Sequence, residues 1–152
     1  MAMKSAKKRM MNFDELREKA MQIAKKVHSG QVDKGGNDYI CHPIRVSENC
    51  SSEEEKIVAL LHDTIEDGNV TTDYLLMQGF SKDIVDAIIS VTRNQDEDYF
   101  DFIQRSKENS IGRIVKIYDL EDNMDVTRLN ELTEKDIERL KKYHRAYNIL
   151  KK

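Results

Sequence analysis

The sequence has little glycine and proline, no tryptophan and few cysteines. Its 152 residues include 6 glycines and 1 proline, well below the roughly 12% that these two residues make up in average proteins. A sandwich or barrel of short strands needs a turn about every 8–12 residues, so this shortage argues against both folds. The two cysteines, Cys41 and Cys50, form no metal-ligand cluster of their own, and we expect reduced thiols in a cytoplasmic protein.

Long apolar runs and an excess of one charge are also missing. The longest apolar run covers residues 57–61, whereas a membrane span needs about 20 residues and a signal-peptide core about 7–15. The 25 basic and 28 acidic residues give a net charge of −3, so no nucleic acid and no membrane is expected as a partner. Residues 1–11 are basic without an apolar core, and we expect a disordered or frayed N-terminus there.

The chain is rich in residues that favour helices, and its apolar residues recur at helical spacing. The pattern predicts one compact all-α domain over residues 12–152, with a glycine-rich loop at 29–42 and no strand. We expect the last helix to complete the core rather than pair with a second subunit, although the oligomeric state stays open. The expected helices cover about 12–29, 44–49, 52–66, 72–78, 81–91, a segment from 99, 111–125 and 133–150.

The segment 60–67, LLHDTIED, gathers a histidine and three acids at the end of an apolar stripe. In a continuous helix His62 lies below Glu66 and Asp63 below Asp67, because residues four apart share a face. Carboxylates packed this closely destabilise a helix, so a divalent cation is the expected compensation. Since adjacent side chains on a helix diverge by about 100°, further ligands have to come from elsewhere.

Two other segments offer such ligands. His28 ends the first predicted helix, and Asp119 is an acid in the otherwise mostly apolar-faced segment 115–123. Together with His62 and Asp63 they form a set of two imidazoles and two carboxylates, which suits Mn, Fe or Zn better than Ca or Mg.

Simpler interpretations of the same residues stay open. His28 can be a helix-end cap, Asp119 can be the salt-bridge partner of Lys116, and the acids after His62 can be solvated side chains. His42 and His144 are expected to be structural, with His42 near the pocket as the alternative.

Taken in order, three blocks resemble the HD-domain metal-dependent phosphohydrolases. They are HSGQ with YICHP in 28–43, ALLHDTIED in 59–67, and VKIYD with NM in 115–124. Among these enzymes the sequence is most similar to the hydrolase domain of RelA/SpoT-type alarmone enzymes and the small Mesh-type pyrophosphohydrolases. The similarity extends over about residues 13–130.

This resemblance implies an HD-domain helical bundle with one divalent metal, usually Mn²⁺, and a small phosphorylated nucleotide as substrate. The implied reaction removes the 3′-pyrophosphate from guanosine tetra- or pentaphosphate. Because ligating imidazoles must be neutral, activity is expected to fall below about pH 6. By position, the resemblance implies four metal ligands, two acids that activate water and two substrate-binding residues: His28, His62, Asp63 and Asp119; Glu66 and Asp67; Lys34 and Asn123.

Two departures weaken the assignment of this substrate. Asp33 stands where the alarmone hydrolases carry an Arg that packs on guanine, and Glu121 and Asp122 replace basic or neutral residues. Both changes are expected to make the edge of the pocket more acidic, so another nucleotide or a smaller phosphorylated compound stays open. The length leaves no room for the synthetase or regulatory domains of the long enzymes. The alternative function is a non-catalytic HD domain that binds a nucleotide or a protein.

Overall fold

The computed structural model describes residues 11–152, which fold into helices with one isolated antiparallel bridge between Val32 and Asp38. The predicted all-α bundle is confirmed. The expected frayed segment 1–11 lies outside the described residues except for its last residue. The elements are α1 (Phe13–Val27), α2 (Cys41–Asn49), α3 (Glu53–Leu61), α4 (Thr64–Asp67), α5 (Thr72–Met77), α6 (Lys82–Ser90), α7 (Tyr99–Glu108), α8 (Ser110–Asn123), the 3₁₀ helix η1 (Val126–Arg128) and α9 (Glu134–Lys151).

Side-chain caps set the helix starts that the sequence predicts. Asn12 accepts a hydrogen bond from a backbone N–H in the first turn of α1. Ser52 with Glu55 and Thr133 with Asp136 form reciprocal capping boxes at α3 and α9. Because each box satisfies backbone donors that a helix start leaves unpaired, these boundaries follow from local sequence alone.

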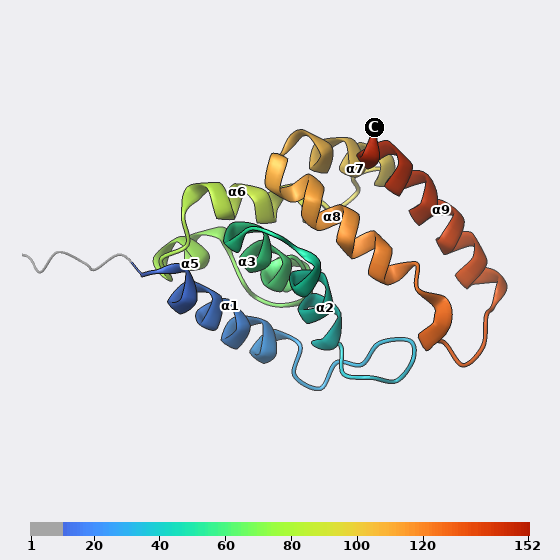
Figure 1. Ribbon diagram of the computed structural model, residues 1–152, viewed down its shortest axis with the longest axis horizontal. Helices are drawn as coiled ribbons and strands as arrows, with labels where there is room; N and C mark the ends of the chain where they lie inside the picture. The colour runs from blue at the N-terminus through green and yellow to red at the C-terminus, as the bar shows by residue number, and fades with distance from the viewer. Residues whose placement is uncertain (1–10) are drawn as a thin grey trace, which may run out of the picture.

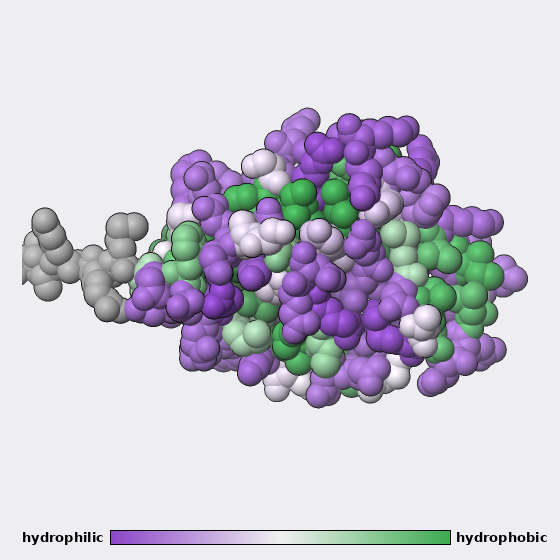
Figure 2. All heavy atoms as spheres, in the orientation of Figure 1, coloured by the Kyte–Doolittle hydropathy of each residue, from purple (hydrophilic) through white to green (hydrophobic). Residues whose placement is uncertain are grey.

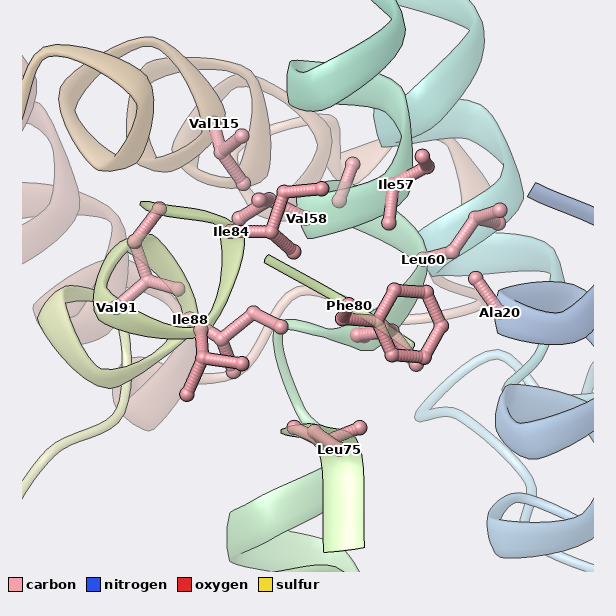
Figure 3. Packing of buried hydrophobic residues seen from close by; sticks show 14 of the residues in the cluster. Ala20, Ile57, Val58, Leu60, Leu75, Phe80, Ile84, Ile88, Val91 and Val115 are labelled. Carbon is pink, nitrogen blue, oxygen red and sulfur yellow. The ribbon is translucent and has the colours of Figure 1, made fainter. Parts of the chain in front are cut away.

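Two apolar clusters hold the bundle together. The larger one joins α1, α3 and α6 and includes Ile57, Leu60 and Ile88, all of which are fully buried (Figure 3). The smaller one lies between α7, α8 and α9, which run side by side (Figure 1). Ala146 and Leu150 of α9 are buried in it, so the last helix completes the core as expected. No helix within residues 11–152 is both long and apolar enough to cross a membrane.

The predicted continuous helix over 52–66 is wrong, because it breaks at His62 and Asp63. At the break, the His62 Nδ1 atom lies 2.5 Å from the carbonyl oxygen of Ala59, and the Thr64 hydroxyl donates to the carbonyl of Leu61. Asp63 has φ −105° and ψ 0°, outside regular helix geometry. The two residues that a straight helix would point apart are therefore the two residues at which the helix is interrupted.

A folded-back loop and a short turn cover the end of the bundle next to this break. In the loop between α1 and α2, the N–H of Asp33 donates to the carbonyl of Asn37, and Gly36 has a φ of 82°. That left-handed conformation is strained for residues other than glycine. The loop therefore reverses tightly and lies near η1, the turn that joins α8 to α9 (Figure 1).

Candidate metal centre and adjoining cavity

Three buried side chains, from α2, from α8 and from the break after α3, converge at one place. One ligand atom from each of His42, His62 and Asp119 lies within 4.8 Å of the others. His42 comes from the first turn of α2 and Asp119 from the middle of α8. Two imidazole nitrogens and a carboxylate at this spacing are a donor set for a mixed nitrogen–oxygen metal site.

The hydrogen bonding of His62 leaves one ring nitrogen free for a ligand. Its Nδ1 must donate to the carbonyl of Ala59, 2.5 Å away, because a carbonyl only accepts. The other nitrogen, Nε2, is buried and has no hydrogen-bond partner among residues 11–152. It lies 3.1 Å from an oxygen of Asp63 and 3.3 Å from an oxygen of Asp119. A backbone bond that sets the tautomer in this way is typical of metal-ligating histidines.

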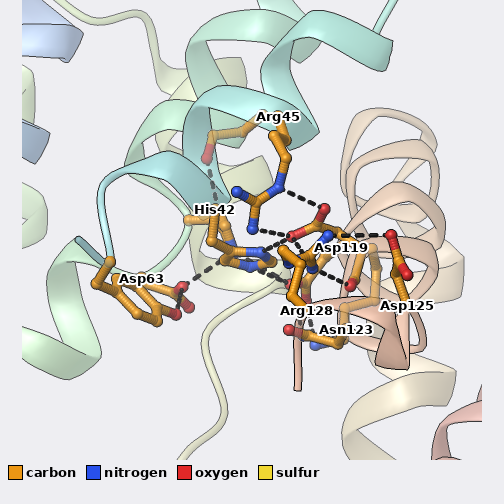
Figure 4. Close-up of polar contacts among 12 residues, drawn as sticks. His42, Arg45, Asp63, Asp119, Asn123, Asp125 and Arg128 are labelled. Carbon is orange, nitrogen blue, oxygen red and sulfur yellow. Dashed lines mark hydrogen bonds and ion pairs between the residues drawn. The ribbon is translucent and has the colours of Figure 1, made fainter. Parts of the chain in front are cut away.

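His42 is oriented by a carboxylate on its outer side. Its Nδ1 lies 2.6 Å from Asp122, and its Nε2 faces Asp119 at 2.8 Å. Asp122 in turn accepts hydrogen bonds from Arg45 and lies 3.3 Å from the guanidinium of Arg128. Figure 4 shows Arg45 and Arg128 close to His42. This carboxylate–histidine pair resembles the outer support that fixes metal-ligating imidazoles.

Asp63 completes the group from the broken segment. Its carboxylate accepts a hydrogen bond of 2.5 Å from the Tyr39 hydroxyl. Burial alone would raise the pKa of Asp63, but the neighbouring His62 outweighs it and lowers the pKa to about 2. Asp63 is therefore an ionised carboxylate that points to the free nitrogen of His62.

The two oxygens of Asp119 face different partners. One oxygen faces both imidazoles and accepts from the side-chain amide of Asn123 at 3.1 Å, while the other lies 2.8 Å from the Lys116 ammonium. Burial would raise the pKa of Asp119, yet Lys116 and His62 hold it well below its ordinary value. Asp119 therefore pairs with Lys116 and also belongs to the cluster with the two imidazoles, so both expectations for this residue hold.

His28, expected among the metal ligands, contacts the ring of Tyr39, which in turn contacts His42 of this cluster. Its ring packs against Tyr39 with centroids 4.8 Å apart, and Tyr39 stands between it and His42. His28 Nδ1 contacts Gln31 at 2.9 Å and lies 3.9 Å from Asp67. Its Nε2 is buried and has no hydrogen-bond partner among residues 11–152, so the predicted ligand role of His28 stays a prediction. His42, expected to be structural, lies next to Asp119. His144, by contrast, is exposed on α9.

The two predicted catalytic acids lie on α4, just after the break. Glu66 accepts a hydrogen bond of 2.6 Å from the backbone N–H of Arg93. Burial raises the pKa of Glu66, partly opposed by this hydrogen bond. Asp67 accepts from the side-chain amide of Gln31 at 3.3 Å. Glu66 is thus the acid whose surroundings favour proton uptake.

A cavity of about 310 Å³ opens beside His42. Both predicted substrate-binding residues, Lys34 and Asn123, line it together with Tyr143. Lys34 forms no hydrogen bond or ion pair among the residues that the structure describes. The rest of the lining mixes charged and apolar side chains, and Figure 2 shows hydrophobic surface at this end of the molecule, over η1 and the start of α9. The apolar lining residues are Val32, Val126, Leu129 and Leu140.

Two of the three acids expected at the edge of the pocket, Asp33 and Asp122, line the cavity, but both are held by neighbouring donors. Asp33 turns back on its own loop, where one oxygen accepts from the N–H groups of Gly35 and Asn37 at 2.9 Å each. Asp122 is neutralised by its basic partners, as described above. Glu121 accepts a hydrogen bond from Tyr147 and does not line the cavity. The departures from the family pattern therefore add less free negative charge than the sequence alone indicates.

Loss of the Asp122 carboxylate should weaken metal binding by His42. In Asp122→Asn, we expect the affinity for Mn²⁺ to fall about 10- to 100-fold, the usual cost of losing an outer partner of a ligating histidine. Calorimetric titration with Mn²⁺ measures this. Glu121→Gln removes the same charge from the adjacent exposed position and should bind Mn²⁺ as the unchanged protein does. Equal affinities for the two variants would contradict the role of Asp122.

The imidazoles should also make metal binding depend on pH. Burial works against the charged form of His62, but Asp63 and Asp119 outweigh it and raise the pKa well above its ordinary value. A raised histidine pKa means that protons compete with the metal up to higher pH. Affinity for Mn²⁺ should therefore fall as the pH decreases, starting above about 6.5, the ordinary imidazole pKa. An affinity that stays constant between about pH 5 and 8 would contradict this.

Comparison with known proteins finds relatives for both the sequence and the fold. The chain is 37% identical over 82 residues to guanosine-3′,5′-bis(diphosphate) 3′-pyrophosphohydrolase of Borreliella burgdorferi, a match that covers 51% of this chain and 12% of that protein. It is 30% identical over 119 residues to the protein of the same name from Aquifex aeolicus, covering 70% and 17%. A GTP pyrophosphokinase of Myxococcus xanthus is 35% identical over 79 residues, covering 49% and 10%. The chain thus spans less than a fifth of these relatives.

One solved structure matches nearly the whole fold. It is described as a metazoan ortholog of SpoT that hydrolyses ppGpp, and it superposes with a TM-score of 0.70 at 19% identity over 99% of this chain and 88% of that one. No family model matches the chain. The sequence and fold similarities together confirm the resemblance to HD-domain hydrolases of the RelA/SpoT type and the HD-type bundle.

Proposed function

We propose that this chain, similar in sequence and fold to RelA/SpoT-type hydrolases, is a metal-dependent phosphohydrolase that removes the 3′-diphosphate of guanosine 3′,5′-bis(diphosphate). In this proposal residues 12–152 form one hydrolase domain. The observation that carries it is the buried convergence of His42, His62 and Asp119 beside a cavity that Lys34 lines together with other charged and apolar side chains. Relatives named for this hydrolysis supply the substrate class.

The donor set fits one divalent ion, and Mn²⁺ is the proposed one. His42, His62, Asp63 and Asp119 are the proposed ligands from the geometry, and His28, whose buried Nε2 also has no hydrogen-bond partner among residues 11–152, stays the alternative that the sequence predicts. The unpartnered Nε2 of His62, facing two ionised carboxylates, is the observation that supports the fit. When bound, such an ion supplies Lewis-acid chemistry, because it lowers the pKa of water and withdraws charge from phosphoryl oxygens.

Glu66 is the proposed proton acceptor. Release of an intact diphosphate means that the bond between the ribose 3′ oxygen and phosphorus breaks while water forms a new oxygen–phosphorus bond. The water loses a proton, and the 3′ oxygen gains one. The pKa of Glu66 is raised by burial, and this makes Glu66 a better base than an ordinary glutamate at neutral pH. Asp67, further along α4, is the proposed partner that orients this water.

The cavity is proposed to hold the nucleoside. The apolar walls can pack against a base, while Lys34 offers a point charge to a phosphate. Asn123 bonds to Asp119 and lines the cavity, so it can bridge the metal group and the substrate. The Asp33 side chain is held by its own loop, which supports access of an anionic substrate.

A substrate screen tests the proposed function. Mn²⁺-loaded protein should release diphosphate from guanosine tetraphosphate faster than it acts on NADPH or common nucleotides, with His62→Ala as the inactive control. If only another nucleotide is hydrolysed, the proposed substrate is wrong and the proposed reaction class stands. A stoichiometric metal without any turnover would favour the non-catalytic binding module.

A further inference from the structure

The carboxylate of Glu66 is held by a surface turn from another part of the chain. The backbone N–H of Arg93 donates to it at 2.6 Å. Arg93 belongs to the segment between α6 and α7, in which residues 93–96 are all exposed. The position of the Glu66 carboxylate therefore depends on what keeps this exposed turn in place.

Arg105, a partly buried residue of α7, ties the turn to the bundle. Its Nη2 donates to the carbonyl oxygen of Thr92 at 2.7 Å, and its Nη1 donates to the carbonyl oxygen of Ile89 at 2.9 Å. Both carbonyls lie at or just after the C-terminal end of α6. Backbone oxygens there lack partners within the helix, and the helix dipole favours a cation. The guanidinium therefore closes the end of α6 and fixes the start of the turn.

A carboxylate at the far end of the turn holds the same guanidinium. Glu97 accepts from Nε and Nη2 of Arg105 at 3.0 and 2.8 Å. Two parallel bonds of this kind between a guanidinium and a carboxylate are strong and fix their relative orientation. The carboxylate of Glu97 also accepts from the backbone N–H of Asn94 at 3.1 Å. Arg105 thus holds the turn at both of its ends.

A single peptide group connects Arg105 to Glu66. The carbonyl of Thr92, which accepts from Arg105, and the N–H of Arg93, which donates to Glu66, belong to the same peptide bond. A trans peptide is planar, so its C=O and N–H point in opposite directions. A hydrogen bond at each end therefore fixes the plane. The cation at the carbonyl also polarises the peptide, which strengthens the N–H as a donor to the carboxylate.

We propose that Arg105 is a positioning residue for the proposed hydrolysis, which holds the peptide group between Thr92 and Arg93 so that its N–H fixes the carboxylate of Glu66. Arg105 is not among the described residues that line the cavity, so it acts through the turn and not on the substrate. The effect on catalysis rests on the proposed function, in which Glu66 accepts the proton of water. The orientation of the peptide group does not.

Steady-state kinetics of Arg105→Gln test the effect on catalysis. We expect a kcat about 10- to 100-fold lower, the scale of a small misplacement of a reacting group. KM and the affinity for Mn²⁺ should stay unchanged, because the cavity and the metal group are not touched. Arg113→Gln is the matched control, since the Arg113 guanidinium also donates to a backbone oxygen near a helix end, that of Leu150 at 2.7 Å. This control should keep the kcat of the unchanged protein.

The same substitution in the Glu66→Gln background separates positioning from a general loss of structure. If Arg105 acts through Glu66, the double variant should have the kcat of Glu66→Gln alone, because the positioned group no longer takes a proton. An equal further loss of kcat in both backgrounds would overturn the proposal. Circular dichroism checks that the variants are folded. If Arg105→Gln does not fold, Arg105→Lys keeps the charge but not the planar fork, and an unchanged kcat in this variant would overturn the proposal.

Hydrogen exchange of the Arg93 amide, followed by NMR on the isotope-labelled full chain, tests the geometry without turnover. Exchange should be about 10-fold or more faster in Arg105→Gln, the scale of one charge-assisted hydrogen bond, and unchanged in Arg113→Gln. Unchanged exchange in Arg105→Gln would overturn the proposal. If exchange is faster but the unchanged protein hydrolyses no nucleotide, the positioning stands and the proposed function fails. If guanosine tetraphosphate is hydrolysed and Arg105→Gln changes neither exchange nor kcat, the reverse holds.

Discussion

His42→Gln should lose the metal and the activity together. The variant removes the ring nitrogen that faces Asp119 at 2.8 Å, while a side chain of similar polarity remains in the buried site. Mn²⁺ affinity should fall by more than the roughly 10- to 100-fold cost of losing an outer partner. Turnover should fall at least about 100-fold, the scale of losing one preorganised electrostatic contact. Metal analysis of the purified protein and initial rates measure both effects.

His28→Gln is the control for this prediction. His28 is also buried, and it too has a nitrogen in contact with a neighbouring side chain, Gln31. Because Tyr39 separates it from His42, the substitution should leave the metal stoichiometry unchanged. Loss of metal in His28→Gln but not in His42→Gln would show that the ligand set expected from the sequence is correct and the set inferred from the geometry is wrong.

Glu66→Gln should abolish most of the turnover and keep the metal. The amide keeps the hydrogen bond from the backbone of Arg93 but cannot take a proton from water at neutral pH. Loss of a general base lowers rates by about 100- to 10,000-fold. The expected signature is a fall in kcat of this size with an unchanged Mn²⁺ affinity, measured by steady-state kinetics and calorimetry.

Asp67→Asn distinguishes the roles of the two acids on α4. Its carboxylate accepts from Gln31 at 3.3 Å and lies 3.9 Å from His28, so it faces the side of the group away from Arg93. We expect a smaller loss of kcat than in Glu66→Gln. If Asp67→Asn has the larger loss of kcat, Asp67 is the base, and the role proposed for Glu66 is wrong.

The helical class was predictable because it depends on local features. Asn12, Ser52 and Thr133 cap their helices through residues three positions away, and the apolar residues between caps repeat at helical spacing. The break at His62 was not predictable in the same way. It depends on side chains that bond to carbonyls three residues earlier, at the end of α3. These are Nδ1 of His62 to Ala59 and the hydroxyl of Thr64 to Leu61, and helix propensity alone does not reveal them.

The residue types around the metal group were likewise visible, but not their roles. An ordered set of histidines and acids indicates a mixed-ligand site, and the resemblance supports one. His28 and His42 could not be ranked from spacing, because both border the same glycine-rich loop. One sign for His42 was its place at the start of a short helix, just before Pro43.

The sequence by itself determined that this chain is helical and carries an HD-type set of histidines and acids, and it predicted a lysine and an asparagine beside the site, where the structure places both at the cavity. Only the tertiary structure decided which histidine meets Asp119, that Asp122 is neutralised by arginines, and that Arg105 and Glu66 bond to the same peptide group. Helix formation is governed by neighbours within four residues, whereas each of these side-chain contacts depends on how α2, α7 and α8 pack on the rest of the bundle. Contacts set by packing between distant segments leave no periodic signal in the chain.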